Sequence, residues 1–198
     1  MQALVSKINA LKRSDVSKIV RERIKEFKSV PTSRWFSELC FCILTANSTA
    51  KKGIEIQQST DFNLTEKNMA KHLKKMGHRF PNARAEFICN APMDVAKQLD
   101  GKTSREAREW LADNVKGIGM KEASHFLRNV GYDDVAIIDR HILNVLSEHG
   151  VIEKPKTLSK KRYEEIEEKL VELGRATDLS LAELDLYLWY MKTGIVLK

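Results

Sequence analysis

The sequence predicts an all-α protein, and three observations support this expectation. Apolar residues recur every three or four positions over much of the chain, which is the period of a helix with one buried face. Serine, threonine or aspartate stands directly before several of these segments, where such residues cap helix N-termini. No stretch shows the sustained apolar–polar alternation of a half-buried strand.

The first predicted helices differ in how much of their surface is apolar. Residues 16–29 form an amphipathic segment that ends before Pro31. Its apolar face consists of Ile19, Val20, Ile24 and Phe27. Residues 34–45 are apolar almost all round, which predicts a buried central helix.

Short polar breaks predict where the next helices begin. Asn47 and Ser48 interrupt the apolar segment, and Ser48 or Thr49 can cap the following helix. Asn82 is placed to cap a helix that continues to Cys89.

The segment around residue 117 predicts two helices joined by a glycine hairpin. Residues 105–114 and 120–130 each have apolar side chains at helical spacing, and Gly131 can end the second helix. Gly117 and Gly119 lie between them, and glycine permits both positive φ and close approach of a ligand. The amides here and in the first helical turn would form an anion site at a helix N-terminus.

Three further helices are predicted towards the C-terminus. Asp139 precedes residues 140–148 as an N-cap. Residues 160–173 have a helical apolar face, and we expect Gly174 to end that helix. Ser180 opens the last helix with a capping box.

Composition restricts the classes of partner and cofactor. The 198 residues include 34 Lys and Arg against 27 Asp and Glu, and this net charge of +7 favours a polyanionic partner. The three cysteines, Cys40, Cys42 and Cys89, follow no secretory signal, so we expect them to be reduced, buried and intracellular. Without a four-cysteine cluster near the C-terminus, we expect no iron–sulfur cluster and no cofactor. No apolar stretch reaches the roughly 20 residues of a membrane helix.

Residues 115–123 and 137–141 resemble the helix-hairpin-helix superfamily of base-excision DNA glycosylases, whose signature is such a hairpin followed by a catalytic aspartate. Three further segments resemble the second type of 8-oxoguanine DNA glycosylase/lyase: residues 44–50, 79–86 and 189–198. That small family is known mainly from archaea and some thermophilic bacteria. The resemblance extends from about Trp35 to the last residue and is weaker over residues 1–30.

The resemblance implies a helix-hairpin-helix glycosylase fold of two helical subdomains around a cleft. Residues 1–198 would form a single glycosylase unit. One subdomain would comprise about 31–138, with the hairpin at 111–125, and the other about 1–30 plus 139–198. The expected partner is double-stranded DNA with 8-oxoguanine or abasic sites, bound by a monomer in the cytoplasm at the nucleoid.

The resemblance also implies that Lys121 and Asp139 are catalytic. A lysine amine that attacks the sugar C1′ forms a Schiff base, and loss of the acidified C2′ proton then expels the 3′-phosphate. One residue would thereby both release the base and cleave the strand. Asp139 would remain anionic and stabilise positive charge at the sugar. The structural alternatives are an exposed helix lysine and a simple N-cap.

The remaining expected site residues read the base or contact the DNA. Base recognition is expected at Lys198, Trp189 and His125, and DNA contacts at Lys116, Gly117, Gly119, Asn47, Ser48, Arg79 and Arg84. The terminal carboxylate of Lys198 would accept the N7–H that distinguishes 8-oxoguanine from guanine. No metal is expected on side chains, although the carbonyls of Val115 and Ile118 can hold a monovalent cation, as in relatives.

Two other functions fit the same sequence. A non-catalytic helix-hairpin-helix DNA-binding module needs the glycines but neither Lys121 nor Asp139 at these positions. The second is a related glycosylase that acts on a different lesion. The absence of the four-cysteine cluster and the presence of the C-terminal Lys198 argue against it. Ordinary loop capping at Asn47 and Ser48, solvated arginines, a core-packed Trp189 and a frayed tail are the bland alternatives for single residues.

Overall fold

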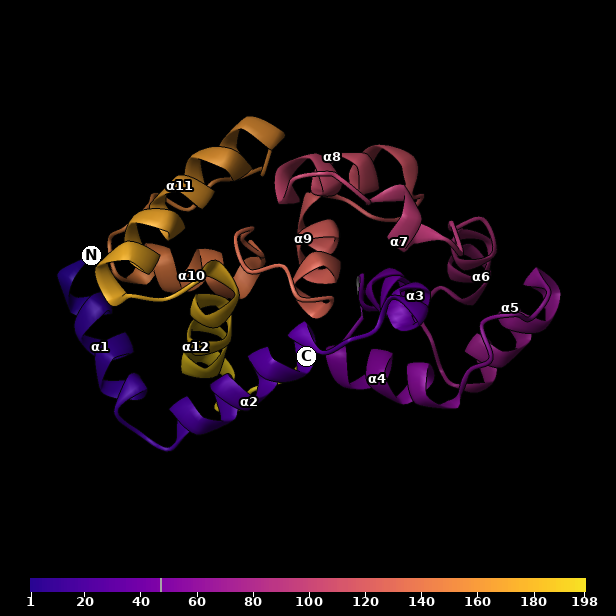
Figure 1. The fold of residues 1–198 in the computed structure, drawn as a ribbon, viewed down its shortest axis with the longest axis horizontal. Helices are drawn as coiled ribbons and strands as arrows, with labels where there is room; N and C mark the ends of the chain where they lie inside the picture. Colours follow the sequence, from indigo (N-terminus) through magenta and orange to yellow (C-terminus); the bar gives the residue numbers. More distant parts are fainter. Residues whose placement is uncertain (47) are drawn as a thin grey trace. The chain divides into compact units, whose positions relative to one another are not determined.

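The computed structural model describes residues 1–46 and 48–198, and all regular structure in these residues is helical (Figure 1). The all-α prediction is therefore confirmed. The chain divides into two compact units, Met1–Ser29 with Leu127–Lys198 as unit 1 and Val30–Phe126 as unit 2. Residues 127–138, which the resemblance placed in the central subdomain, group with unit 1.

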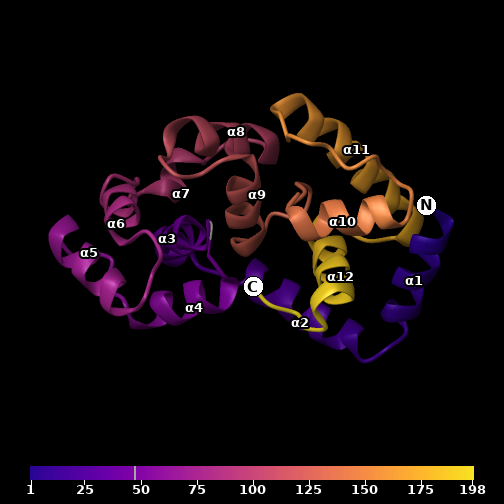
Figure 2. The same ribbon diagram turned by 180° about the vertical axis from the view of Figure 1, so that it is seen from behind.

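Unit 1 is built from both ends of the chain. Its helices are α1 (Gln2–Lys12), α2 (Val16–Lys28), α10 (Arg140–Glu148), α11 (Lys160–Thr177) and α12 (Leu181–Thr193). Helix α12 packs against α1, α2, α10 and α11, and Figure 2 shows it between α10 and α2. The core between α2 and α12 consists of Val16, Val20, Phe27, Leu186 and Tyr187. Because α12 packs against these helices, residues 194–198, which follow it, begin on unit 1.

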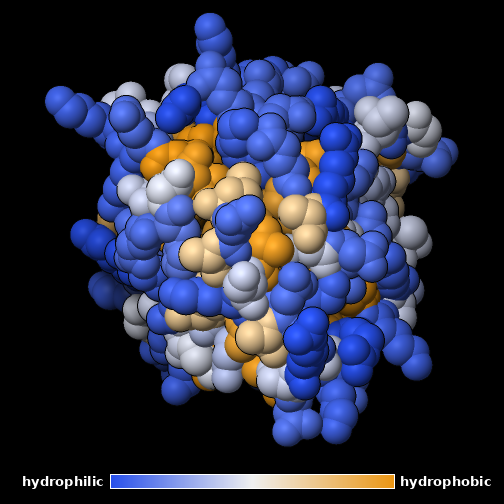
Figure 3. Space-filling model, turned by 90° about the vertical axis from the view of Figure 1, so that its left-hand side faces the viewer, coloured by the Kyte–Doolittle hydropathy of each residue, from blue (hydrophilic) through white to orange (hydrophobic). Residues whose placement is uncertain are grey.

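The prediction was wrong for one residue of the expected apolar face of α2. Ile19 is 48% exposed, whereas Val20 is fully buried. Adjacent residues on a helix point about 100° apart, so the stripe through Val16, Val20 and Phe27 leaves Ile19 at its edge. The face of unit 1 seen in Figure 3 is mostly hydrophilic, with small apolar patches between charged side chains.

Unit 2 surrounds one buried helix. It contains η1 (Thr32–Arg34), α3 (Trp35–Thr45), α4 (Ala50–Ser59), α5 (Glu66–Lys75), α6 (Pro81–Cys89), α7 (Val95–Gln98), α8 (Ser104–Asn114) and the start of α9 (Met120–Asn129). Helix α3 packs against α4, α6 and α7, and every residue from Glu38 to Thr45 is buried. The predicted central helix is thus confirmed. Helices α1, α5 and α7 were not predicted from the sequence.

Most predicted caps are confirmed. Thr49 caps α4 by accepting from the Lys52 amide at 3.2 Å. Ser180 and Glu183 make both halves of the capping box at α12, and Gly194 ends that helix with φ of 71°.

Two predicted helix boundaries are wrong. Helix α6 begins at Pro81 and not after Asn82, because proline lacks the N–H that would go unsatisfied there and has the right φ. Helix α11 continues through Gly174 to Thr177 and ends at Asp178, which has φ of 53°. Gly174 instead allows the Leu179 carbonyl to approach the helix closely, since a Cβ there would lie 2.9 Å from that carbonyl oxygen.

The cysteines are all free, and Cys40 and Cys42 are buried in α3. Cys89 is exposed, so the expectation that it is buried was wrong. It is the last residue of α6. Among the described residues, no helix has the length and apolar character needed to span a bilayer.

A buried ion pair lies inside unit 1. The Arg128 guanidinium donates to the Asp185 carboxylate, and their side chains are only 5% and 9% exposed. Arg128 also donates to the Asn129 side-chain oxygen at 3.1 Å, and its guanidinium carbon lies 4.9 Å from the Phe27 ring centre. A charge this deeply buried is tolerated only while its partners remain.

We expect Asp185→Ala to lower the free energy of unfolding by about 3–5 kcal/mol, because it leaves the buried Arg128 charge without its carboxylate. Urea denaturation measures the loss. The control is Glu172→Ala, which breaks the exposed Lys169–Glu172 pair and should cost no more than about 1 kcal/mol. Similar losses in the two variants would contradict the importance of the buried pair.

Candidate functional site

The hairpin between α8 and α9 is shaped by Gly117 and Phe87. Gly117 has φ of 85°, a conformation that side chains disfavour. A Cβ at this position would also overlap the Phe87 ring of α6. Val115 and Ile118 are buried on either side, and the Ile118 amide donates to the Val115 carbonyl at 3.1 Å. The aromatic ring therefore supports a turn that only glycine fits.

The second glycine leaves space in front of a helix start. Gly119 does not have positive φ, and the nearest neighbour of a Cβ there would be Glu122 Oε2 at 3.6 Å. The Gly119 carbonyl accepts the first helical bond of α9, from Ala123, at 2.8 Å. The amides of the first turn of a helix lack partners within the helix, so this end suits an anion.

Lys116 is the exposed cation of the hairpin. Its amine pairs with Glu86 of α6 at 2.5 Å and lies 5.7 Å from the Phe87 ring centre. The side chain is 64% exposed, and an exposed pair of this kind is weak, so the amine can exchange Glu86 for a phosphate.

Lys121 lies in the first turn of α9 with a carboxylate beside it. Its Nζ is 2.9 Å from Glu122 Oε1, and the two side chains are 30% and 18% exposed. Glu122 was not among the residues singled out from the sequence. His125, one turn further on, is partly buried and meets Phe41 edge-on, with 5.5 Å between ring centres.

The end of α3 is held by two side chains from outside it. Arg84 is 6% exposed and donates to the Ala46 carbonyl at 2.7 Å. His78 accepts from the Phe80 amide through Nδ1 at 3.1 Å, so its Nε2 carries the proton and donates to Leu44 at 2.9 Å. Burial lowers the pKa of His78, which keeps it neutral in this role. Sequence reasoning had not identified His78.

The remaining predicted residues of this region are placed only in part. Asn47 lies outside the described residues. Ser48 is partly buried, and its amide donates to the Thr45 carbonyl at 2.9 Å. Arg79 is exposed, with its guanidinium carbon 5.0 Å from the Phe80 ring centre.

In unit 1, Asp139 caps α10 as predicted. Its Oδ1 accepts from the His141 and Ile142 amides at 2.8 and 2.9 Å. The partly buried side chain is thereby fixed in orientation by backbone that cannot move without unwinding the helix.

Asp139 and Trp189 are linked through one histidine. The His141 ring meets the Trp189 ring edge-on, with 4.8 Å between centres and an angle of 70° between planes. Trp189 is partly exposed, and its buried Nε1 has no hydrogen-bond partner within the described residues. Lys198, at the end of the chain, is partly buried, so the terminus is not a fully exposed tail.

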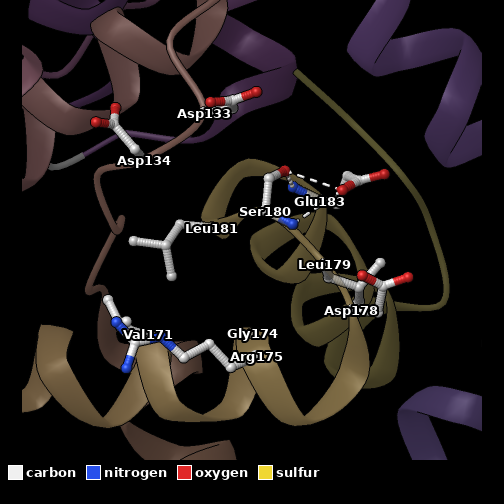
Figure 4. A pocket seen from close by; sticks show the side chains of 10 residues that line it. All are labelled: Asp133, Asp134, Val171, Gly174, Arg175, Asp178, Leu179, Ser180, Leu181 and Glu183. Carbon is white, nitrogen blue, oxygen red and sulfur yellow. Dashed lines mark hydrogen bonds between the residues drawn. The ribbon is translucent and has the colours of Figure 1, made fainter.

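None of the predicted site residues lines the large pocket of unit 1. It has a volume of about 700 Å³ and is open to solvent (Figure 4). Its charged lining residues are Asp133, Asp134, Arg175, Asp178 and Glu183. A lining with four carboxylates and one guanidinium repels phosphate, so this pocket does not suit a polyanion.

Comparison with known proteins places the chain among DNA repair enzymes. Residues 20–179 match the family model described as 8-oxoguanine DNA glycosylase. The chain is 50% identical to the 8-oxoguanine DNA glycosylase/AP lyase of Methanocaldococcus jannaschii, over 98% of this chain and 99% of that protein. The protein of the same name from Korarchaeum cryptofilum is 48% identical over 98% of each chain.

Solved structures agree with the sequence relatives. A crystal structure of the Methanocaldococcus jannaschii 8-oxoguanine glycosylase/lyase, in complex with a 15mer DNA containing 8-oxoguanine, has a TM-score of 0.95 and 50% identity, and the match covers 99% of this chain and 100% of that one. The 8-oxoguanine DNA glycosylase of Thermotoga maritima has a TM-score of 0.89 and 39% identity, with coverage of 100% and 99%.

The two hairpin glycines should respond differently to alanine. We expect Gly117→Ala to destabilise the protein by more than the roughly 1–2 kcal/mol of left-handed backbone alone, because its methyl group also displaces Phe87. Gly119 does not have positive φ, and a Cβ there would lie at an ordinary contact distance from its neighbour, so we expect Gly119→Ala to cause little loss of stability. Thermal unfolding of both variants measures the difference. Equal losses would show that the turn does not depend on Gly117.

Proposed function

This chain belongs to the 8-oxoguanine DNA glycosylase family, and from that premise we propose that it removes 8-oxoguanine from double-stranded DNA and cleaves the strand 3′ to the resulting abasic site. The main support is full-length identity of 50% to a glycosylase/lyase, together with a half-buried lysine amine at the start of the hairpin's second helix. A DNA-binding module without chemistry would not need that amine. We propose that the enzyme acts as a monomer on nucleoid DNA in the cytoplasm.

We propose that Lys121 is the nucleophile. Its neutral amine attacks C1′, the bond to the base breaks, and a Schiff base forms between Nζ and the sugar. Loss of the C2′ proton then expels the 3′-phosphate by β-elimination. The position of Lys121 in the first turn of α9, directly after the hairpin, supports this role.

We propose that Asp139 stabilises the positive charge that develops at the sugar. The two amide bonds to Oδ1 keep the carboxylate oriented before substrate arrives, so no reorganisation is needed during the reaction. A carboxylate held in this way is also a cap, and the two roles use the same geometry.

The other predicted residues are proposed to hold the DNA and the base. Base recognition is proposed for Trp189, Lys198 and His125, and phosphate or duplex contact for Lys116, Gly117, Gly119, Asn47, Ser48 and Arg79. Buried Arg84 already serves Ala46, so we propose that it supports the interface by holding the end of α3. The hairpin carbonyls of Val115 and Ile118 are proposed to accept a monovalent cation.

The lysine assignment predicts a covalent intermediate. Lys121→Gln should abolish borohydride trapping on 8-oxoguanine and abasic duplexes and abolish strand cleavage, because the glutamine amide cannot form a Schiff base. Binding of lesion duplex, measured by anisotropy, should persist because the hairpin backbone is unchanged. Lys169→Gln, at an exposed position of α11, is the matched control and should trap normally. Normal trapping by Lys121→Gln would require another amine as nucleophile.

The aspartate assignment separates charge from capping. Asp139→Asn retains a capping oxygen but removes the charge, so we expect base excision to slow about 100- to 1,000-fold with little change in stability. Single-turnover excision and thermal unfolding measure the two effects. Ser159→Ala, which removes the cap of α11, should do the reverse and cost about 1 kcal/mol without slowing excision. If Asp139→Asn turns over normally, the residue is a cap alone.

A further inference from the structure

Glu122 forms an ion pair with the proposed nucleophile. Consecutive residues on a helix do not face one another, yet Glu122 Oε1 lies 2.9 Å from Lys121 Nζ. The lysine side chain therefore folds back towards this carboxylate. With side chains 30% and 18% exposed, the pair is less hydrated than a surface ion pair, and its proton can move directly between the two groups.

The chemistry of a lysine nucleophile requires such an acceptor. An ammonium group has no lone pair, so Lys121 must lose a proton before it attacks C1′. We propose that Glu122 is a catalytic residue that accepts this proton from Lys121 and returns it to the leaving oxygen during Schiff-base formation, an inference that rests on the proposed function.

The step balances at an abasic site in its open aldehyde form. The Lys121 ammonium transfers one proton to the Glu122 carboxylate, and the resulting amine adds to C1′. A proton shift within the adduct gives a carbinolamine, which loses its hydroxyl group as the protonated Glu122 supplies the proton that makes it water. The products are an iminium ion at Lys121, one water molecule and the original Glu122 carboxylate.

A second cation, the Arg84 guanidinium, interacts electrostatically with Glu122. Arg84, from α6, faces Glu122, while Lys121 faces it from its own helix. Burial lowers the pKa of Arg84, and the charge of Glu122 opposes that effect. Because a guanidinium remains charged in proteins, Arg84 supplies a positive charge near Glu122 both before and after Lys121 gives up its proton. Arg84 also holds Ala46, so its own position is set by the backbone.

The test is the pH dependence of Schiff-base formation by the full-length protein. Borohydride trapping on a duplex with a preformed abasic site is measured under single-turnover conditions from about pH 6 to about pH 9, which lies below the ordinary lysine pKa. Glu122→Gln keeps the shape of the side chain and removes the acceptor. We expect it to trap about 100-fold more slowly near neutral pH and to recover steadily as hydroxide replaces the missing base. Glu122→Asp should retain part of the rate.

Controls separate this role from helix stabilisation. Glu106→Ala removes the first-turn glutamate of α8, which closes a capping box, and should lose stability while keeping the wild-type rate and pH profile. All rates are measured below the lowest melting temperature, and the shape of the profile does not depend on the fraction of active protein. A Glu122→Gln profile that has the wild-type shape, at the same or a uniformly lower rate, would overturn the proposal.

The result also distinguishes this inference from the proposed function. If the wild-type protein traps no adduct, the lysine nucleophile and the role of Glu122 both fail. If the wild type traps, Lys121→Gln does not, and Glu122→Gln behaves as wild type, only the proton-acceptor role fails. Slow trapping by Glu122→Gln that alkaline pH restores supports both.

Discussion

The hairpin before α9 depends on the contact between residue 117 and the Phe87 ring, and the proposed chemistry depends on the hairpin. A side chain at Gly117 would overlap that ring and would also have to adopt φ of 85°. While the turn is kept, α9 starts at Met120 and Lys121 lies in its first turn. One aromatic residue of α6 thereby determines where the amine lies in unit 2. Lys116 and Arg84, which flank the same ring, share this support.

The two helix starts that bear the proposed catalytic residues use their carboxylates differently. At α10 two backbone amides bind the Asp139 carboxylate, so its position is rigid. At α9 the carboxylate of Glu122 instead faces the neighbouring amine, where a proton can be exchanged. A carboxylate that stabilises charge should be immobile, and one that exchanges a proton must reach its donor. The local geometry matches the role proposed for each.

Buried cations serve as anchors in both units. Arg128 pairs with Asp185 of α12, whereas Arg84 donates a hydrogen bond to the carbonyl at the end of α3. His78 adds a neutral hydrogen bond to the same end of α3. Each anchor joins segments that are distant in sequence, which is why no local pattern indicated it. The cost of burying these groups is offset only by partners that the folded chain supplies.

Local patterns in the sequence determined the helical class, the buried α3, the glycine hairpin, and the caps Asp139 and Ser180, because period, capping and glycine preference act within a few residues. Local patterns also misled in places. Gly174 was expected to end a helix, but it lies inside α11, where the Leu179 carbonyl leaves no room for a Cβ. The ion pair of Glu122 with Lys121 and the burial of Arg84 were decided only by tertiary structure. A side chain's partner depends on which helices pack together, and hydrophobic periodicity does not encode that choice.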